Sequence, residues 1–311
     1  MYLTCQSIPL SSIQLCTDWN LHPWEFGIIT PELEESLTLN GIIHPPLVLA
    51  DSAKTFTVIS GAKRLEFTRR LSWPSHLCCM VLAENTPPRL ILNLILADQN
   101  TASKLSLAEK ARFVEIACRL LNIEDVKSIC KKELQLKTGR STISDLLRIL
   151  QQDEIIIKEI HAGRLQDRMV SEILSLAEES DKLALVQLFK SFGMGDGKQK
   201  RFFTLIRDIA LREGLTISSY LQQEKIRAIL DHEEMNVPQK IHHLGELLQQ
   251  EISPSYSVAE RDFVKQVKDL HLPINYSISH SPSFEKDEIT LSIIFKNIAA
   301  CKNYLAPKDK R

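Results

Sequence analysis

The hydrophobic period of this 311-residue chain changes twice along its length, and these changes limit what the chain can fold into. Up to about residue 100, apolar runs at 44–51, 55–60 and 77–84 predict short strands, and helical periods follow Gly61 and Pro87. From about residue 105 the period is helical only. From about residue 253 the pattern is mixed again, with a helix, strands at 273–281 and 288–297 and a closing helix. The sequence therefore predicts an α+β protein with several domains.

We expect four parts along the chain. They are an N-terminal α/β domain at 1–104, an all-helical domain at 105–192, a helical extension at 193–252 and a helix–strand–strand–helix unit at 253–311. The clearest linker is the glycine-containing stretch FGMGDGKQ at 192–199. The last unit is expected to pair with a copy of itself, because two strands and two helices bury little apolar surface on their own.

Composition excludes several classes of protein. The formal net charge is −1, so any affinity for nucleic acid or membranes must be local. The apolar runs are too short to span a bilayer, and the N-terminal residues MYLTCQSIPL lack a secretion signal, so we expect a cytoplasmic protein with no membrane partner. The seven cysteines contain no C-x-x-C pair, and we interpret them as buried reduced thiols. No histidine lies at ligand spacing from a cysteine or another histidine, so no metal site is expected.

One candidate site lies in the stretch TFTVISGAKRLEF at 55–67. A glycine between a strand and a helix lets the backbone approach a ligand closely, and the free N–H groups at a helix start favour an anion. Lys63 and Arg64 would add charged donors. The pattern therefore indicates a phosphate site at Gly61, with a tight turn and two solvated cations as the alternative.

A second candidate site lies in the stretch IEDVKSICKKELQLKTGRSTISDLLRIL at 123–150. It reads as a helix, a turn and a second helix that opens with the short hydroxylated residues Ser141, Thr142 and Ser144, which could reach base edges and phosphates. Its cations outnumber its acidic residues and form a local basic patch. They are Lys127, Lys131, Lys132, Lys137, Arg140 and Arg148. The alternative is an amphipathic helix pair with a solvated face.

Together these stretches resemble the ParB-type partition proteins, whose N-terminal domain shares its fold with sulfiredoxin. The matches to the family patterns G-x-x-x-P-[IL]-x-V, G-E-R-R and D-L-x-P-x-E-x-A are Gly41, Pro45, Val48, Gly61, Arg64, Leu105, Glu109 and Ala111. The segment GRSTISDLLRIL at 139–150 is similar to the family's DNA-reading helix. The resemblance implies a ParB/sulfiredoxin-like domain followed by a helix-turn-helix domain.

The same resemblance implies a function and a set of site residues. It implies a dimeric, nucleoid-associated protein that binds double-stranded DNA in chromosome or plasmid partition, acts with a ParA-type ATPase and holds CTP with Mg²⁺. The implied nucleotide-binding residues are Gly41, Gly61, Lys63, Arg64 and Gln99. The implied DNA-binding residues are Lys137, Arg140, Ser141, Thr142, Ser144 and Arg148.

Departures from the family pattern keep other functions open. Ala62 and Lys63 stand where the family has glutamate and arginine, and DQNTA at 98–102 replaces E-N-x-Q-R without its final arginine. Asp98 is one methylene shorter than the family's glutamate, and catalysis is sensitive to misplacement of about 1 Å, so Asp98 is only a weak candidate for a CTPase residue. Two alternatives remain, a ParB-fold transcriptional regulator without nucleotide and a ParB-like nuclease. A sulfiredoxin-type activity is excluded because residues 60–64 contain no cysteine.

Overall fold

A computed structural model describes residues 3–25, 28–51, 54–71, 75–100, 105–136, 140–281 and 288–305. The chain forms two compact units, Met1–Asp196 and Gly197–Arg311. The finer division into four domains stays a prediction.

The first unit contains a five-stranded mixed sheet in the order β1-β5-β3-β4-β2. Its strands are β1 (Leu3–Pro9), β2 (Ile13–Gln14), β3 (Leu47–Ala50), β4 (Phe56–Ser60) and β5 (His76–Leu82). β3 runs antiparallel to β4 and parallel to β5, and β1 runs antiparallel to β5. The strands expected at 44–51, 55–60 and 77–84 are therefore confirmed as β3, β4 and β5. β1 was not predicted, because this edge strand exposes most of its side chains and shows no apolar alternation.

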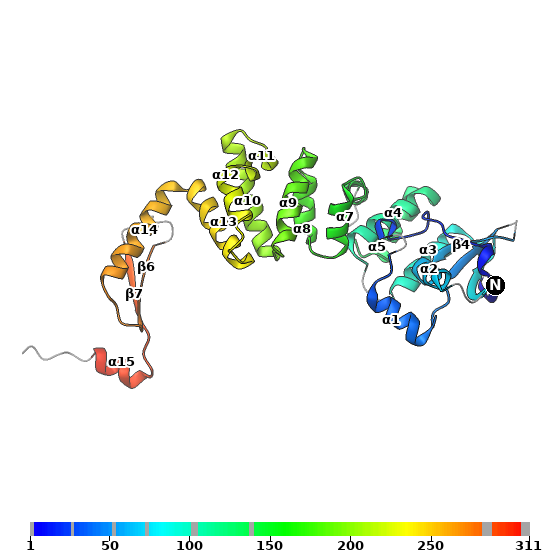
Figure 1. Ribbon diagram of the computed structural model, residues 1–311, viewed down its shortest axis with the longest axis horizontal. Helices are drawn as coiled ribbons and strands as arrows, with labels where there is room; N and C mark the ends of the chain where they lie inside the picture. The colour runs from blue at the N-terminus through cyan, green and yellow to red at the C-terminus, as the bar shows by residue number, and fades with distance from the viewer. Residues whose placement is uncertain are drawn as a thin grey trace, which may run out of the picture. The chain divides into compact units, whose positions relative to one another are not determined.

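Three helices accompany the sheet, namely α1 (Pro31–Asn40), α2 (Ala62–Arg70) and α3 (Pro88–Asn100). Figure 1 shows α2 and α3 beside β4, and α3 packs against that strand. Val48, Leu65 and Cys79 are completely buried in the core between these elements. Because β4 leads into α2 through Gly61, this packing fixes where the start of α2 lies.

The cysteines differ from the sequence expectation. Cys79 and Cys130 are buried, but Cys5, Cys78 and Cys118 are exposed. Cys78 and Cys79 are neighbours on β5, so they point to opposite faces of the sheet. Cys118 lies on the solvent side of its helix. The expectation of buried thiols was therefore wrong for these three positions.

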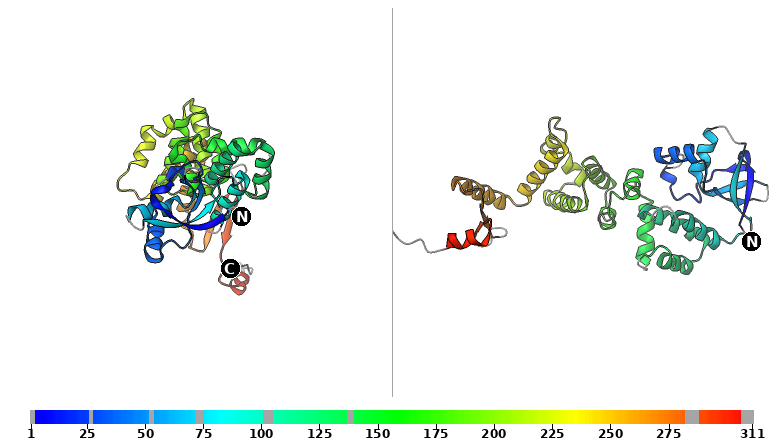
Figure 2. Two further views of the ribbon diagram at one scale, coloured as in Figure 1. Left: turned by 90° about the vertical axis from the view of Figure 1, so that its right-hand side faces the viewer. Right: turned by 90° about the horizontal axis from the view of Figure 1, so that it is seen from below.

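In the described residues after α3, the remaining elements of the first unit are helices, as the helical period predicted. They are α4 (Leu107–Leu120), α5 (Ile123–Lys132), α6 (Arg140–Ile149), α7 (Glu154–His161), α8 (Asp167–Leu174) and α9 (Glu179–Ser191). In Figure 2 the earlier members of this set are the teal helices that follow the blue and cyan α/β part. α4 begins with a capping box in which Ser106 and Glu109 satisfy each other's backbone N–H groups.

The second unit is also mixed. Its helices are α10 (Asp196–Glu213), α11 (Ile217–Leu221), α12 (Glu224–Leu230), α13 (Val237–Ile252), α14 (Pro254–Asp269) and α15 (Ile298–Leu305). The strands β6 (Tyr276–His280) and β7 (Ile289–Ile293) form an antiparallel pair, as expected for the last part of the chain. The expected linker at 192–199 is shorter, because α10 begins at Asp196. Within the described ranges, no helix combines the length and apolarity needed to cross a bilayer.

Candidate nucleotide and nucleic-acid sites

The turn before α2 requires glycine. Gly61 has a φ of +89°, and a Cβ there would lie 3.1 Å from Pro46 and 3.2 Å from the guanidinium carbon of Arg64. The start of α2 borders a cavity of about 200 Å³. This cavity is lined by Cys16, Trp19, Asn20, Leu21, His22, Glu25, Leu33, Val58, Ile59, Ser60, Gly61, Ala62, Lys63, Arg64 and Ile95. The geometry matches the predicted arrangement of a strand, a glycine turn and an open helix N-terminus.

Carboxylates already balance the two cations of this turn. Lys63 Nζ donates to Glu25 Oε2 at 3.0 Å. Arg64 Nη2 lies 3.4 Å from Asp98 Oδ2, and its other nitrogen Nη1 donates to the His44 carbonyl. Burial raises the pKa of Glu25, but the hydrogen bond and charge of Lys63 outweigh it and leave that pKa below its ordinary value. An anion that binds here must therefore displace or rearrange these ion pairs.

The structure brings together only part of the predicted nucleotide set. Gly61, Lys63, Arg64 and Asp98 lie around the turn, and Ser60 Oγ also donates to Asp98. Gly41 is not among the residues that line the cavity. It ends α1 with a φ of +68°, and its N–H donates to the Leu37 carbonyl, so it has a structural role. The predicted Gln99 lies in α3, but its side chain falls outside the part of the molecule that the structure describes.

The predicted DNA-reading helix is α6. Ile143, Leu146 and Ile149 form its buried face, whereas Thr142 is half-buried and Ser144 is exposed. Short hydroxylated residues at the start of a helix suit contacts to DNA, and the structure keeps both off the buried face. At the end of α5, Lys131 and Lys132 are exposed and contribute to the basic patch. Lys137 and the side chains of Arg140 and Ser141 lie outside the described residues.

Arg148, another of the predicted DNA-binding residues, forms a hydrogen bond within the protein. Its Nη2 donates to the Leu174 carbonyl at 2.5 Å, at the C-terminal end of α8. Helix ends leave carbonyl groups without intrahelical partners, so this contact stabilises the end of α8. Any contact that Arg148 makes to a phosphate must share the guanidinium with this bond.

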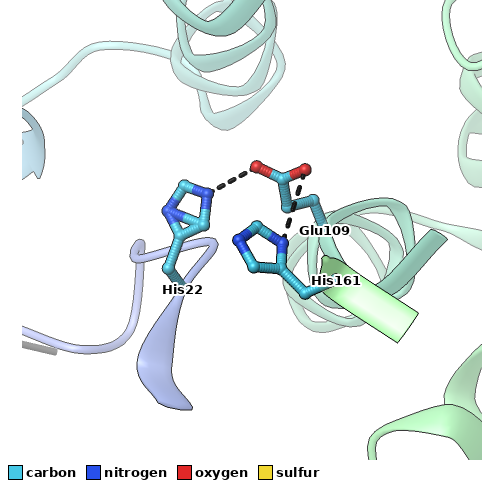
Figure 3. Close-up of side chains that lie close together, drawn as sticks. All are labelled: His22, Glu109 and His161. Carbon is cyan, nitrogen blue, oxygen red and sulfur yellow. Dashed lines mark hydrogen bonds and ion pairs between the residues drawn. The ribbon is translucent and has the colours of Figure 1, made fainter. Parts of the chain in front are cut away.

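The structure also assembles a cluster that sequence reasoning missed, formed by His22, Glu109 and His161 (Figure 3). His22 Nε2 lies 2.5 Å from Glu109 Oε1, and His161 Nδ1 lies 3.8 Å from Glu109 Oε2. Burial lowers the pKa of His22 to about 4, against the opposing effect of the Glu109 charge. The three residues are separated by long stretches of sequence, so no local spacing signal could have found them.

The chain is similar to a curated protein and to several solved structures. No family model matches the chain. The chain is 26% identical over 174 residues to the probable chromosome-partitioning protein ParB of Borreliella burgdorferi, which covers 54% of this chain and 62% of the relative. The chain thus spans less than two thirds of that relative.

Solved structures of ParB proteins are also similar to the chain. The truncated Caulobacter crescentus ParB complexed to the centromeric parS site is 14% identical, with 64% of this chain and 98% of that chain covered and a TM-score of 0.35. The same protein complexed with CTP-γ-S is 13% identical, with 60% and 98% covered and a TM-score of 0.24. A Pnob8-like ParB N-domain is 16% identical, with 79% and 97% covered and a TM-score of 0.34. The curated relative agrees with the resemblance that the motifs indicated, and the chain is similar to a ParB protein over 174 residues.

Proposed function

We propose that this chain is a DNA-binding partition protein of the ParB type. The observation that carries the proposal is the similarity over 174 residues to a probable chromosome-partitioning protein. The helix pair α5–α6 supports it, because exposed lysines and small hydroxylated residues occupy the surface that the sequence assigns to DNA. The protein acts on double-stranded DNA of the nucleoid, with a ParA-type ATPase as its partner and two chains joined through the C-terminal unit.

The DNA part of the proposal is tested by salt dependence. Each phosphate contact that is removed makes the slope of log affinity against log salt less negative by about 0.9. We expect Arg140→Ala to weaken binding of double-stranded DNA and to make this slope less negative by about 1. Lys158→Ala is the matched control, because Lys158 pairs with Glu154 on α7, outside the proposed surface. Equal slopes for the intact chain and Arg140→Ala would show that Arg140 makes no phosphate contact.

CTP with Mg²⁺ is the proposed ligand of the Gly61 turn. The ligand's phosphates would lie at the start of α2, with Lys63 and Arg64 released from Glu25 and Asp98 to bind them. The cavity of about 200 Å³ is smaller than ligand pockets of roughly 300–1,000 Å³, so the nucleotide requires the side chains to rearrange.

A second candidate function follows from the same ion pairs. A ParB-fold transcriptional regulator needs no nucleotide, and both cations of the turn already have carboxylate partners. Equilibrium binding of labelled CTP, with ATP and GTP as controls, separates the two functions. Selective binding that is lost in Arg64→Ala and kept in Arg70→Ala, on the last turn of the same helix, supports the nucleotide-dependent protein. No CTP binding by the intact chain, with or without DNA, favours the regulator.

A further inference from the structure

His22, Glu109 and His161 form a cluster of three side chains that can ligate a metal ion, called here the histidine–carboxylate cluster. They come from the loop before the 3₁₀ turn Pro23–Glu25, from the first turn of α4 and from the last residue of α7. One ligand atom from each lies within 4.8 Å of the others. Two imidazoles and one carboxylate are a donor set used by zinc and other divalent transition metals. Figure 3 shows both rings turned toward the two oxygens of Glu109.

Hydrogen bonds around the cluster hold its members in place. Glu109 Oε2 accepts from the Ser106 backbone N–H at 2.6 Å in the capping box of α4. Ser106 Oγ lies 3.0 Å from His161 Nδ1 and so orients that ring. The same nitrogen faces Glu109 Oε2 at 3.8 Å, so Ser106 and Glu109 both lie on the Nδ1 side of the ring. The other ring nitrogen, Nε2, lies on the side of Glu25.

The loop that carries His22 is anchored to α4. Arg112 is buried, and its guanidinium donates to the carbonyl groups of Thr17 at 2.8 Å and Asn20 at 3.1 Å. The His22 backbone N–H donates in turn to Asn20 Oδ1 at 2.9 Å. These contacts fix the position of His22 relative to Glu109 without involving either of the two side chains. A binding site needs such preorganisation.

The surroundings of the cluster favour a dication. The side chains of His22, Glu109 and His161 are only 19%, 11% and 20% exposed. Trp24 packs edge-on against both rings, with ring centroids 6.3 Å from His22 and 5.4 Å from His161. Glu25 Oε1 lies 3.8 Å from His161 Nε2 and places a second carboxylate at the rim, where its other oxygen pairs with Lys63.

We propose that the histidine–carboxylate cluster binds one divalent transition-metal ion, for which Zn²⁺ is the best match, and that the ion ties the His22 loop to α4 and α7. Ligand atoms of a tetrahedral zinc ion lie about 3.3 Å apart when the bonds are about 2.0–2.2 Å long. His22 and Glu109 must therefore separate by about 1 Å, and a neutral His22 that ligates through Nε2 carries its ring proton on Nδ1. The site goes beyond the proposed function, because it requires neither nucleotide nor DNA.

Zinc titration of the full-length, chelator-treated chain tests the proposal. Isothermal titration calorimetry and elemental analysis should show one tight equivalent of Zn²⁺ that is lost in His22→Gln and in Glu109→Gln. Glu109→Gln is informative because glutamine also completes a capping box, so α4 keeps its start while the carboxylate is removed. His76→Gln, at an exposed histidine at the start of β5, is the matched control and should keep the equivalent.

The exposed thiols Cys5 and Cys78, whose sulfur atoms lie 3.1 Å apart, could capture zinc elsewhere. Cys78→Ser must therefore also keep the equivalent, and Co²⁺ in place of Zn²⁺ should give a spectrum without thiolate-to-metal charge transfer. A second readout is stability, because an ion that binds only the folded state raises the unfolding midpoint. Zn²⁺ should raise the midpoint of the intact chain and of His76→Gln, but not those of His22→Gln and Glu109→Gln. If the cluster variants bind and respond like the intact chain, or if the intact chain binds no Zn²⁺, the cluster is a hydrogen-bonded network and the proposal is wrong.

Discussion

Gly61 belongs to the proposed ligand site, and its backbone conformation requires glycine. Its φ of +89° is unfavourable for any L-residue, and a Cβ would be 3.1 Å from Pro46. We expect Gly61→Ala to lower the free energy of unfolding by about 1–2 kcal/mol, because a left-handed conformation costs a side-chain-bearing residue about that much. Urea unfolding followed by circular dichroism measures the change.

Gly245 gives the matched control for this substitution. It lies inside α13, and a Cβ there would be 3.6 Å from Phe202, an ordinary contact. Gly245→Ala should therefore stabilise the chain by about 0.5–1 kcal/mol, the helix propensity difference between the two residues. If Gly61→Ala and Gly245→Ala changed the free energy of unfolding in the same direction, the backbone conformation at Gly61 would not be what requires glycine.

Glu159 is a buried carboxylate with two cationic partners. It lies on α7 and is only 2% exposed, with Arg164 Nη2 2.8 Å and Lys190 Nζ 3.0 Å from its Oε1. The hydrogen bond from Arg164 is the largest cause that lowers the pKa of Glu159. We expect Glu159→Gln to destabilise the first unit by about 1–3 kcal/mol at pH 7, toward the lower end because both partners are half-exposed. Tryptophan fluorescence reports on this unit alone, because Trp19, Trp24 and Trp73 all lie in it.

The pH dependence of this effect has a defined sign. A carboxylate with a lowered pKa stabilises the folded state above its unfolded pKa, near 4.5, and loses that contribution as the pH falls through the folded value. The difference between the intact chain and Glu159→Gln should therefore be constant at neutral pH and shrink below about pH 4.5. Glu154→Gln, on the same helix with the exposed partner Lys158, should change stability by no more than about 0.5 kcal/mol. A difference that grows on acidification would contradict this interpretation.

Single residues of the candidate site were predictable only where their signal is local. The sequence identified Gly61, Lys63 and Arg64, because a glycine between two periodic segments is visible within a few residues. It did not identify Glu25 as the partner of Lys63, 38 positions away. His22 and Glu109 are 87 positions apart, so only the fold reveals that they meet. Side-chain partners of this kind depend on tertiary packing, which local patterns do not encode.

At the scale of elements, one arginine on α4 holds the loop that precedes α1. Arg112 is buried and donates to the Thr17 and Asn20 carbonyls, and it also pairs with Glu115. Arg112→Met should lower the free energy of unfolding by about 2–4 kcal/mol, because the half-buried carbonyl groups lose their donors. Urea unfolding followed by tryptophan fluorescence is a direct measurement, since Trp19 lies within the anchored segment and Trp24 follows it.

Arg119 provides the matched control on the same helix. It pairs with the same Glu115, at 2.7 Å, but it is half-exposed and bridges no loop. Arg119→Met should change stability by no more than about 0.5 kcal/mol, as expected for an exposed pair four residues apart. If both substitutions cost the same, the charge of Glu115 rather than the loop carbonyls would explain the effect of Arg112.

Elements were predicted best where their period is strong. The strands β3, β4 and β5 and the helices α2 to α6 lie where apolar spacing placed them. The helical pattern predicted for 105–192 did not separate α8, which ends at Leu174, from α9, which begins at Glu179. α7 was not distinguished from its neighbours, because its run of Ile155, Ile156 and Ile157 shows no helical alternation. Boundaries of this kind depend on caps and packing rather than on hydrophobic period.

At the scale of the whole molecule, the C-terminal elements expose more apolar surface than an isolated unit explains. The large apolar side chains that are more than half exposed there are Leu270, Ile274, Ile289, Leu291, Ile294, Ile298 and Leu305, together with Val258. A two-stranded sheet such as β6–β7 is marginal by itself. We expect a second copy of this chain to cover these residues, because identical surfaces related by a two-fold axis can cover each other. This is the pairing that the sequence predicted for the last part of the chain.

The expected dimer leads to a prediction about mass. Sedimentation equilibrium of the full chain should give twice the mass of the 35.4 kDa monomer. Ile294→Glu should raise the dimer dissociation constant by about 100-fold, which corresponds to about 2.7 kcal/mol and combines lost apolar burial with an unpaired buried charge. Leu211→Glu is the matched control, because Leu211 is 77% exposed and Ile294 75%, but Leu211 lies on α10. Equal weakening by both substitutions would show that the two copies are joined elsewhere than at the C-terminal apolar surface. A monomeric intact chain would contradict the dimeric partition protein proposed above.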